Sequence, residues 1–165
     1  MKTIRIFDEK NYDTSWQRTE REAVRAVILR GNKIALVRSR KEGFYKFPGG
    51  GIETDETHLK AVIRETGEET GLQVIPGSVK ELGIVWEIRK GLYGEEIFDQ
   101  KSYYYLAEVL DEVKEQKLDK YEQDLEYELV WEDLKRAYEI NMELGQKYET
   151  TFIIRESYML EYLLQ

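Results

Sequence analysis

The distribution of apolar residues along the chain predicts a series of short strands. Residues 23–29 are largely apolar, Gly31-Asn32 is a turn signal, and apolar residues return at 33–38, so this segment is typical of a β-hairpin. A short aromatic run at 44–47 ends at Pro48, which has no backbone N–H to give to a sheet. The full set of predicted strands covers 23–29, 33–38, 44–47, 79–89, 96–109 and 127–131.

Other segments place their apolar residues at helical spacing. This spacing predicts helices at about 56–70, 132–145 and 151–164. Thr150 or Thr151 is a candidate N-cap for the last of them. Between the strands and the final helices, residues 111–126 mix charges of both signs with little apolar content, which favours a solvated loop or a fraying helix.

The order of these elements indicates the fold class. Many strands with a few helices, and no regular alternation of strand and helix, predict an α+β fold with a mixed sheet. The sequence contains no Pro/Gly/Ser-rich linker and no internal repeat, and its 165 residues are enough to bury one sizeable core. We therefore expect residues 1–165 to form a single domain.

The composition narrows the possible chemistry. Lys and Arg total 25 and Asp and Glu total 33, which gives a formal net charge of −8 and disfavours binding of a nucleic-acid polymer through a basic patch. The chain has no cysteine, so disulfides, thiolate nucleophiles and cysteine-ligated zinc are excluded. Its one histidine, His58, is expected at the surface. Any catalysis must then use carboxylates, hydroxyls, lysine, arginine or tyrosine.

The sequence also bears on location. No apolar run approaches the roughly 18 residues that a membrane-spanning helix needs, and residues 1–8 lack the apolar core of a signal peptide. We expect a soluble, cytoplasmic protein that binds no membrane.

The predicted helix at 56–70 has two chemically different sides. One side carries an apolar stripe formed by Leu59, Val62, Ile63 and Thr66. The other side gathers three carboxylates at positions i, i+3 and i+4, bordered by Arg64: Glu65, Glu68 and Glu69. Carboxylates at this spacing repel one another, and oxygen-only ligands suit hard cations such as Mg²⁺ or Mn²⁺. A solvated glutamate-rich surface is the simpler interpretation of the helix taken alone.

A glycine run directly before this helix strengthens the metal hypothesis. Gly49, Gly50 and Gly51 must form a loop, because three successive glycines destabilise both helix and strand. Such a loop lets the backbone approach a ligand closely, and the Gly50 carbonyl is a candidate additional metal ligand. A divalent ion between protein and substrate would let an acidic protein bind an anionic compound.

These residues form a recognisable motif, because eight positions keep a fixed register over the 23 residues from Gly50 to Leu72. The register resembles the Nudix box, and its positions are Gly50, Glu56, Arg64, Glu65, Glu68, Glu69, Gly71 and Leu72. Two positions depart from the pattern. Thr66 stands where an aliphatic residue is preferred, and its hydroxyl can turn to a backbone carbonyl. Asp55 stands where glycine is frequent, which affects the geometry of the loop.

The resemblance implies a fold, a reaction and a set of roles. The fold is a mixed β-sheet sandwiched between helices, and the reaction is Mg²⁺-dependent hydrolysis of a nucleoside diphosphate linked to another group. By position in the motif, Glu65, Glu68 and Glu69 are the metal-binding, catalytic carboxylates, and Arg64 orients them. Glu56 has a structural role or makes an outer metal contact. The resemblance also implies a further carboxylate outside the motif, for which the candidates are Glu95, Glu96, Glu126 and Glu128.

Outside the motif, the candidates for substrate binding are Lys46, Arg38 and Phe44. Lys46 lies just before the glycine loop, and Arg38, Arg25 or Arg40 could also reach phosphates. Phe44 could stack on a base, although packing in the core is the more common role for an aromatic residue there. Trp86 and Trp131 are expected in the core.

The function most consistent with this pattern is hydrolysis of a (deoxy)nucleoside triphosphate, chosen because features typical of other substrate subclasses are missing. Two other classes stay open. One is a catalytically inert module of the same fold that binds nucleotides, although such a module would not need its carboxylates intact. The other is an oligomeric scaffold joined through the two C-terminal helices, and homodimerisation is compatible with catalysis.

Overall fold

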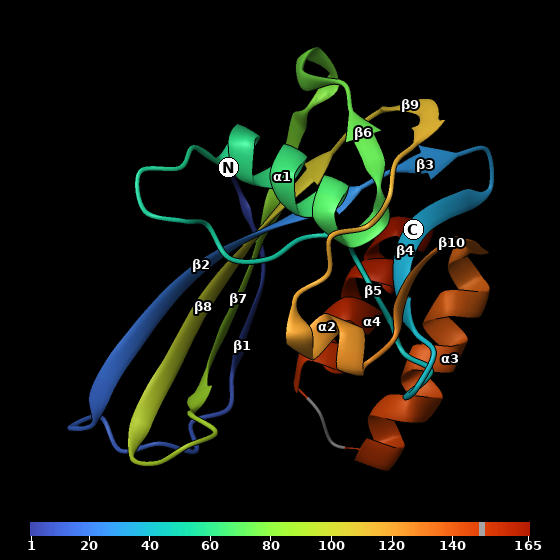
Figure 1. Ribbon diagram of the computed structural model, residues 1–165. Helices are drawn as coiled ribbons and strands as arrows, with labels where there is room; N and C mark the ends of the chain where they lie inside the picture. The colour runs from blue at the N-terminus through green and yellow to red at the C-terminus, as the bar shows by residue number, and fades with distance from the viewer. Residues whose placement is uncertain (149–150) are drawn as a thin grey trace.

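In the computed structural model, which describes residues 1–148 and 151–165, long strands form a sheet along one side of the molecule (Figure 1). Its outer strand β1 runs parallel to β7, β7 runs antiparallel to β8, and β8 runs parallel to β2. The strands of this sheet are β1 (Thr3–Asp8), β7 (Lys80–Lys90), β8 (Glu96–Leu106) and β2 (Gln17–Val27). Parallel and antiparallel pairs together make this a mixed sheet, as predicted.

A second sheet faces the first. Its central strand β4 pairs antiparallel with each neighbour. The strands are β10 (Tyr127–Asp133), β4 (Lys33–Ser39), β3 (Leu29–Arg30) and β5 (Tyr45–Lys46). A small antiparallel pair, β6 (Leu72–Val74) with β9 (Val109–Val113), lies beside α1, and a 3₁₀ turn, Pro76–Ser78, follows β6.

Helices cover both sides of the strands. They are α1 (His58–Thr70), α2 (Lys120–Asp124), α3 (Leu134–Tyr148) and α4 (Thr151–Leu164). The side chains of strand β2 point alternately to the two faces of its sheet, and each face packs against different helices. Val24 packs into a core with Ala61 and Val62 of α1, whereas Val27 packs into a core with Met159 and Leu160 of α4. The strands therefore lie between α1 and the α3–α4 pair, which is the predicted sandwich (Figure 1).

The ends of α1 match the expectation from sequence, but its buried side is rotated. Thr57 caps the N-terminus, and Gly71 ends the helix in the left-handed conformation with φ of 76°. The predicted stripe placed Leu59 in the core, yet Leu59 is 41% exposed, and Glu69 is buried instead. The helix turns this way because Glu69 has partners in the interior, described below. Thr66 is buried, and its hydroxyl has no hydrogen-bond partner within the described residues, contrary to expectation.

Several other expectations need correction. The predicted hairpin is confined to β3 and β4, because β2 ends at Val27 and pairs with β8. The polar stretch 111–126 contains the end of β9 and the short helix α2, and the strands β1, β6 and β9 extend beyond the predicted set. Thr150 lies outside the described residues. Trp86 and Trp131, which were expected in the core, are half-buried.

Among the described residues, none of the helices has the length and apolar character needed to cross a membrane.

Candidate functional site

The glycine loop is tied to β2 by its backbone. The N–H of Val24 donates to the Gly50 carbonyl at 2.9 Å, and the N–H of Ala26 donates to the Pro48 carbonyl at 2.8 Å. Gly49 has φ of +143°, and a Cβ there would lie 2.0 Å from the Val24 carbonyl oxygen. Only glycine fits so close to another strand in this conformation. Asp55, further along the loop, has φ of +62°, so this aspartate occupies the left-handed region that favours glycine.

Arg64 connects the loop to the carboxylates of α1. Its guanidinium donates to both oxygens of Glu56 at 2.8 Å, to Glu65 Oε1 at 2.7 Å and to Glu68 Oε2 at 3.2 Å. It also donates to the Gly51 carbonyl at 3.1 Å. These hydrogen bonds lower the pKa of Glu56 to about 2. Arg64 is thus placed to orient Glu65 and Glu68, the role that its position in the motif implies.

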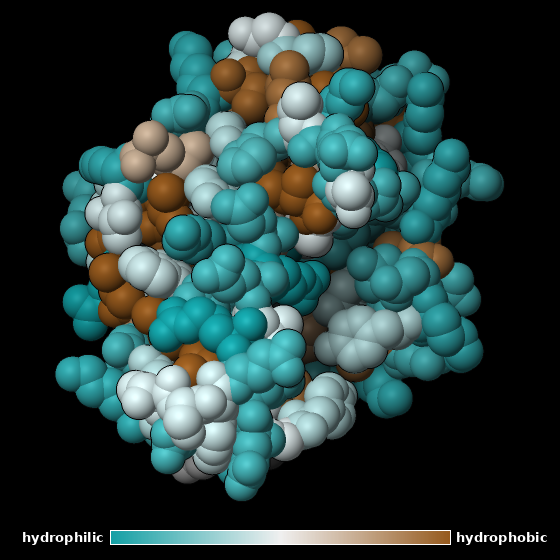
Figure 2. Space-filling view, turned by 90° about the vertical axis from the view of Figure 1, so that its left-hand side faces the viewer, coloured by the Kyte–Doolittle hydropathy of each residue, from teal (hydrophilic) through white to brown (hydrophobic). Residues whose placement is uncertain are grey.

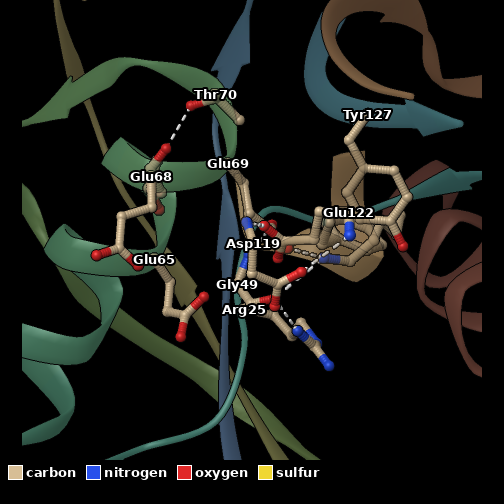
Figure 3. Close-up of polar contacts among 12 residues, drawn as sticks. Arg25, Gly49, Glu65, Glu68, Glu69, Thr70, Asp119, Glu122 and Tyr127 are labelled. Atoms are coloured by element: carbon tan, nitrogen blue, oxygen red, sulfur yellow. Dashed lines mark hydrogen bonds and ion pairs between the residues drawn. The ribbon is translucent and has the colours of Figure 1, made fainter. Parts of the chain in front are cut away.

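Glu69 points into the interior, toward the glycine loop. Figure 3 shows its carboxylate beside Gly49, whereas Glu65 and Glu68 lie away from it. Glu69 is 2% exposed, accepts the Gly49 N–H at 2.8 Å, and forms an ion pair with Lys46 Nζ. Lys46 in turn donates to the Gly49 carbonyl at 3.1 Å. Glu69 therefore fixes the loop and pairs with the lysine predicted to bind substrate.

The donor set fits a hard divalent cation, although the side chains are engaged elsewhere. Across the described residues, no group of three His, Asp or Glu side chains converges closely enough to hold a metal ion. A Cβ at Gly50 would lie 2.4 Å from Glu65 Oε2, so the missing side chain brings the Gly50 backbone up to this carboxylate. Burial, and then the negative charge of Glu69, raise the pKa of Glu65. Carboxylate oxygens whose negative charge is not balanced by nearby cations suit Mg²⁺ or Mn²⁺.

A cavity of about 340 Å³ opens beside Glu69 and the glycine loop. One wall is the face of the β2–β8–β7 sheet. The remaining walls come from β5, α2, α4 and Tyr127, the first residue of β10. Cationic side chains on these walls are Arg21, Arg25, Lys46, Arg89 and Arg155. A cavity with this many cations is suited to an anionic ligand.

The predicted substrate-binding residues lie in different places. Lys46 lines the cavity with Gly50 and Glu69. Arg38 does not line it, because its half-exposed side chain lies 4.0 Å from Glu128 on the neighbouring strand. Phe44 is 1% exposed and packs edge-to-face with Tyr127 and Phe152, so it has no ring face for a base. We therefore retain Lys46 alone from this group.

Sequence reasoning missed the acidic residues of α2. Asp119 and Glu122 line the cavity, whereas Glu95, Glu96, Glu126 and Glu128 do not. Burial raises the pKa of Glu122 to about 7, with further contributions from the charges of Glu69 and Asp119. Asp119 and Glu122 form a capping box, and the spacing of an aspartate three residues before a glutamate was the available signal.

His58 is not the simple surface residue that was expected. Its ring centroid lies 4.4 Å from that of Tyr103, and its Nδ1 is 2.7 Å from the hydroxyl of Tyr105. It is half-buried between α1 and β8, away from the cavity.

Together, the fold and site define an α+β protein in which a carboxylate-bearing helix borders a cation-rich cavity. A family model described as the NUDIX domain matches residues 19–151, which is most of the chain. The chain belongs to the NUDIX family.

Curated relatives match a shorter segment. The chain is 42% identical over 65 residues to an ADP-ribose pyrophosphatase of Methanocaldococcus jannaschii, covering 38% of this chain and 37% of that protein. It is 38% identical over 60 residues to a CTP pyrophosphohydrolase of Escherichia coli, covering 34% and 44%. It is 50% identical over 65 residues to an RNA pyrophosphohydrolase of Stenotrophomonas maltophilia, covering 38% and 30%. The matched segment thus spans less than half of each relative.

Solved structures agree on the fold over a larger part of the chain. A NUDIX hydrolase from Nitrosomonas europaea superposes with a TM-score of 0.60 at 20% identity, covering 86% of this chain and 89% of that one. A MutT NUDIX hydrolase from Burkholderia pseudomallei gives 0.51 at 22% identity, covering 71% and 85%. At these identities the likeness establishes the fold alone.

Proposed function

We propose that the protein hydrolyses a diphosphate linkage in a nucleoside diphosphate derivative, with a (deoxy)nucleoside triphosphate as the favoured substrate and Mg²⁺ as the cofactor, replaceable by Mn²⁺. The observation that carries the proposal is the Arg64-ordered set of carboxylates on α1 beside a cation-lined cavity. Support also comes from the relatives, since three of them are named as an ADP-ribose pyrophosphatase, a CTP pyrophosphohydrolase and an RNA pyrophosphohydrolase.

In this proposal Glu65, Glu68, Glu69 and the Gly50 carbonyl hold the divalent ion. When bound, the ion neutralises phosphate charge and makes a water molecule more acidic. Glu69 must exchange its ion pair with Lys46 for the ion, which leaves the Lys46 ammonium free to bind a phosphate oxygen. Arg64 keeps Glu65 and Glu68 oriented throughout.

The proton of the attacking water needs an acceptor, and we assign this role to Glu122. Its carboxyl lines the cavity, and a pKa of about 7 suits a general base near neutral pH. Water oxygen forms a bond to one phosphorus, the bond from that phosphorus to the bridging oxygen breaks, and the proton passes to Glu122. The other phosphate-containing product leaves in line with the attack.

The proposal is tested with Glu68→Gln, which keeps the shape of the side chain and removes its charge. We expect Mg²⁺-dependent turnover to fall at least about 100-fold, because one charged group of the site is lost. The assay measures released phosphate or pyrophosphate from nucleoside triphosphates, sugar nucleotides, ADP-ribose and dinucleotides, with Mg²⁺ or Mn²⁺. The control is Glu139→Gln on α3, a solvent-exposed glutamate in a long ion pair with Lys135.

Full activity in Glu68→Gln, with circular dichroism unchanged, would contradict the assignment of this carboxylate. A wild-type protein that hydrolyses none of these compounds but binds one of them in calorimetry would instead be a nucleotide-binding module. Figure 2 shows the side of the molecule that carries β2 and β8, where hydrophobic atoms lie in separate patches among hydrophilic ones.

A further inference from the structure

The segment between β9 and α2 crosses the C-terminal end of α1 (Figure 1). We call residues 114–119 the crossing segment. The N–H of Lys114 donates to the Gly71 carbonyl at 2.8 Å, and the N–H of Lys117 donates to the Glu68 carbonyl at 2.7 Å. Carbonyls at the end of a helix lack partners within the helix, so donors from outside satisfy them. The crossing segment is therefore attached to the turn of α1 that carries two of the proposed metal-binding carboxylates.

One side chain of the crossing segment joins three parts of the fold. Nε2 of Gln116 donates to the backbone carbonyl of Glu69 on α1, and it also donates to the Tyr127 carbonyl on β10 at 3.3 Å. A primary amide has two N–H donors, so a single side chain can serve both carbonyls. The side chain of Gln116 is half-buried between these partners. Gln116 therefore holds the crossing segment to the helix of the motif and to the strand β10.

The next element, α2, has little packing of its own to hold it. Within Lys120–Asp124, a range that the structure describes in full, no residue is buried. A helix this short is not stable alone. On its far side, the Ser39 hydroxyl donates to the Leu125 carbonyl at 2.8 Å, and on its near side lies the crossing segment. The position of α2 therefore depends on the segments that precede and follow it.

Helix α2 brings the general base assigned above to the cavity. In Figure 3, Glu122 lies on the same side as Glu69, and both residues line the cavity. A general base must lie within hydrogen-bond reach of the water whose proton it accepts, and a misplacement of about 1 Å is enough to reduce turnover. The placement of α2 relative to α1 should therefore affect the rate directly.

We propose that Gln116 is a positioning residue: the hydrogen bonds of its amide to α1 and β10 hold α2, and with it Glu122, in place beside Glu69. This inference rests on the proposed function and adds to it a residue outside the motif. In the described part of the chain, Gln116 is not among the residues that line the cavity, so it acts through Glu122. The Glu69 carboxylate has its own partners in Lys46 and Gly49, so loss of the amide should move α2 and leave that carboxylate in place.

The variant Gln116→Met tests the proposal, because methionine keeps the length of the side chain and removes both donors. The fold should persist, since the backbone hydrogen bonds of Lys114 and Lys117 remain. In the assay above, kcat should fall about 10-fold or more, the usual cost of losing a group that orients a functional side chain. KM and the Mg²⁺ concentration that gives half-maximal turnover should stay within about twofold of wild type.

The double variant with Glu122→Gln shows whether Gln116 acts through the base. Glu122→Gln alone should lower kcat about 100-fold. Adding Gln116→Met should then change kcat by less than about twofold, because no base is left to misplace. Losses that multiply would show that Gln116 acts by another route and would overturn the proposal. An unchanged kcat in either single variant would overturn it as well.

The matched control is Gln73→Met. Nε2 of Gln73 on β6 donates to the Glu112 carbonyl on β9 at 3.2 Å, so this amide also joins two segments beside α1. Among the described residues that line the cavity, Gln73 is absent. Gln73→Met should keep the wild-type kcat and KM. A loss of kcat equal to that of Gln116→Met would indicate a general effect of lost amide contacts and contradict the specific role.

Amide hydrogen exchange separates this inference from the proposed hydrolysis. The N–H groups of Gln123 and Leu125 donate to the carbonyls of Asp119 and Tyr121 in and around α2. In Gln116→Met they should exchange about fivefold faster than in the wild-type protein or in Gln73→Met. If the wild-type protein hydrolyses nothing but shows this pattern, the hydrolysis is refuted and the link between Gln116 and α2 stands. Wild-type turnover with unchanged exchange and unchanged kcat in Gln116→Met would leave the hydrolysis standing and overturn the inference.

Discussion

At the scale of single residues, neighbouring glutamates on one helix have different surroundings. Glu68 keeps 40% of its side chain exposed and accepts from Arg64, whereas the next residue, Glu69, is buried against Lys46 and Gly49. One step of 100° around the helix separates solvent from interior here. Neighbouring carboxylates of the motif therefore have different surroundings: Arg64 holds Glu65 and Glu68, whereas Lys46 pairs with Glu69.

The pair of Glu56 and Arg64 predicts a specific pH dependence of stability. The pKa of Glu56 is lowered from an ordinary value of 4.5 to about 2, so its ionised form stabilises the folded protein at pH values above 4.5. This stabilisation is lost as the pH falls from 4.5 through 2, because protonation then breaks the ion pair. Urea unfolding of the wild-type protein and of Glu56→Gln should differ most at pH 6 and least near pH 2. A difference that does not change with pH would refute this role.

Much of the site was predictable residue by residue, because the relevant spacings are local. Arg64 contacts Glu65 and Glu68 as their motif positions imply, and Gly50 lies against Glu65. Residues whose role depends on distant segments were not predictable. The aromatic character of Phe44 is the same in a core as in a base-binding site, and only the tertiary packing decides between them.

At the scale of elements, adjacent glycines of the loop have different functions. A Cβ at Gly49 would lie 2.0 Å from the backbone oxygen of Val24, in a conformation with positive φ. A Cβ at Gly50 would lie 2.4 Å from the carboxylate of Glu65, which is the mobile end of a side chain. The backbone of Val24 is fixed within a strand and cannot easily move, whereas the carboxylate of Glu65 can rotate away.

Alanine substitutions should separate these functions. Gly49→Ala should lower the free energy of unfolding by about 2 kcal/mol or more, because the loop must leave β2. Gly50→Ala should unfold at nearly the wild-type urea concentration and lose turnover, because the carboxylate of Glu65 is displaced. Both quantities are measured on the same preparations. Equal loss of stability in the two variants would show that the loop responds as a unit.

The elements themselves were predicted where local signals were strong. The span of α1 and the two long strands β7 and β8 were predicted. Strand β1 escaped prediction because its partner β7 lies about 80 residues away, and the parallel pairing leaves no local turn signal. The departure of β2 from the hairpin has the same cause, since its hydrogen bonds go to β8.

At the scale of the whole molecule, a buried ion network joins α4 to the sheet and to the glycine loop. Arg155 of α4 pairs with Glu87 of β7 and with Glu156. Glu156 also accepts the backbone N–H of Phe47 at 2.8 Å, just before the loop. All three charged side chains are at most 5% exposed. The network therefore fixes the C-terminal helix, the sheet and the loop relative to one another.

Removing one member of this network should be costly. Arg155→Met leaves Glu87 and Glu156 buried without their cation, and we expect the free energy of unfolding to fall by about 3–5 kcal/mol. The control is Arg136→Met, whose guanidinium is largely exposed and 3.8 Å from Glu132, with an expected loss of about 1 kcal/mol or less. Urea denaturation monitored by tryptophan fluorescence measures both. Similar losses in the two variants would show that the network adds little.

The cavity draws its lining from almost the whole length of the chain, from Arg21 on β2 to Arg155 on α4. During translation, the glycine loop and α1 leave the ribosome well before the C-terminal helix does. A nascent chain thus exposes every acidic residue of the motif while the cavity beside them still lacks the wall formed by α4. The cavity is therefore complete only after nearly the entire domain has been synthesised.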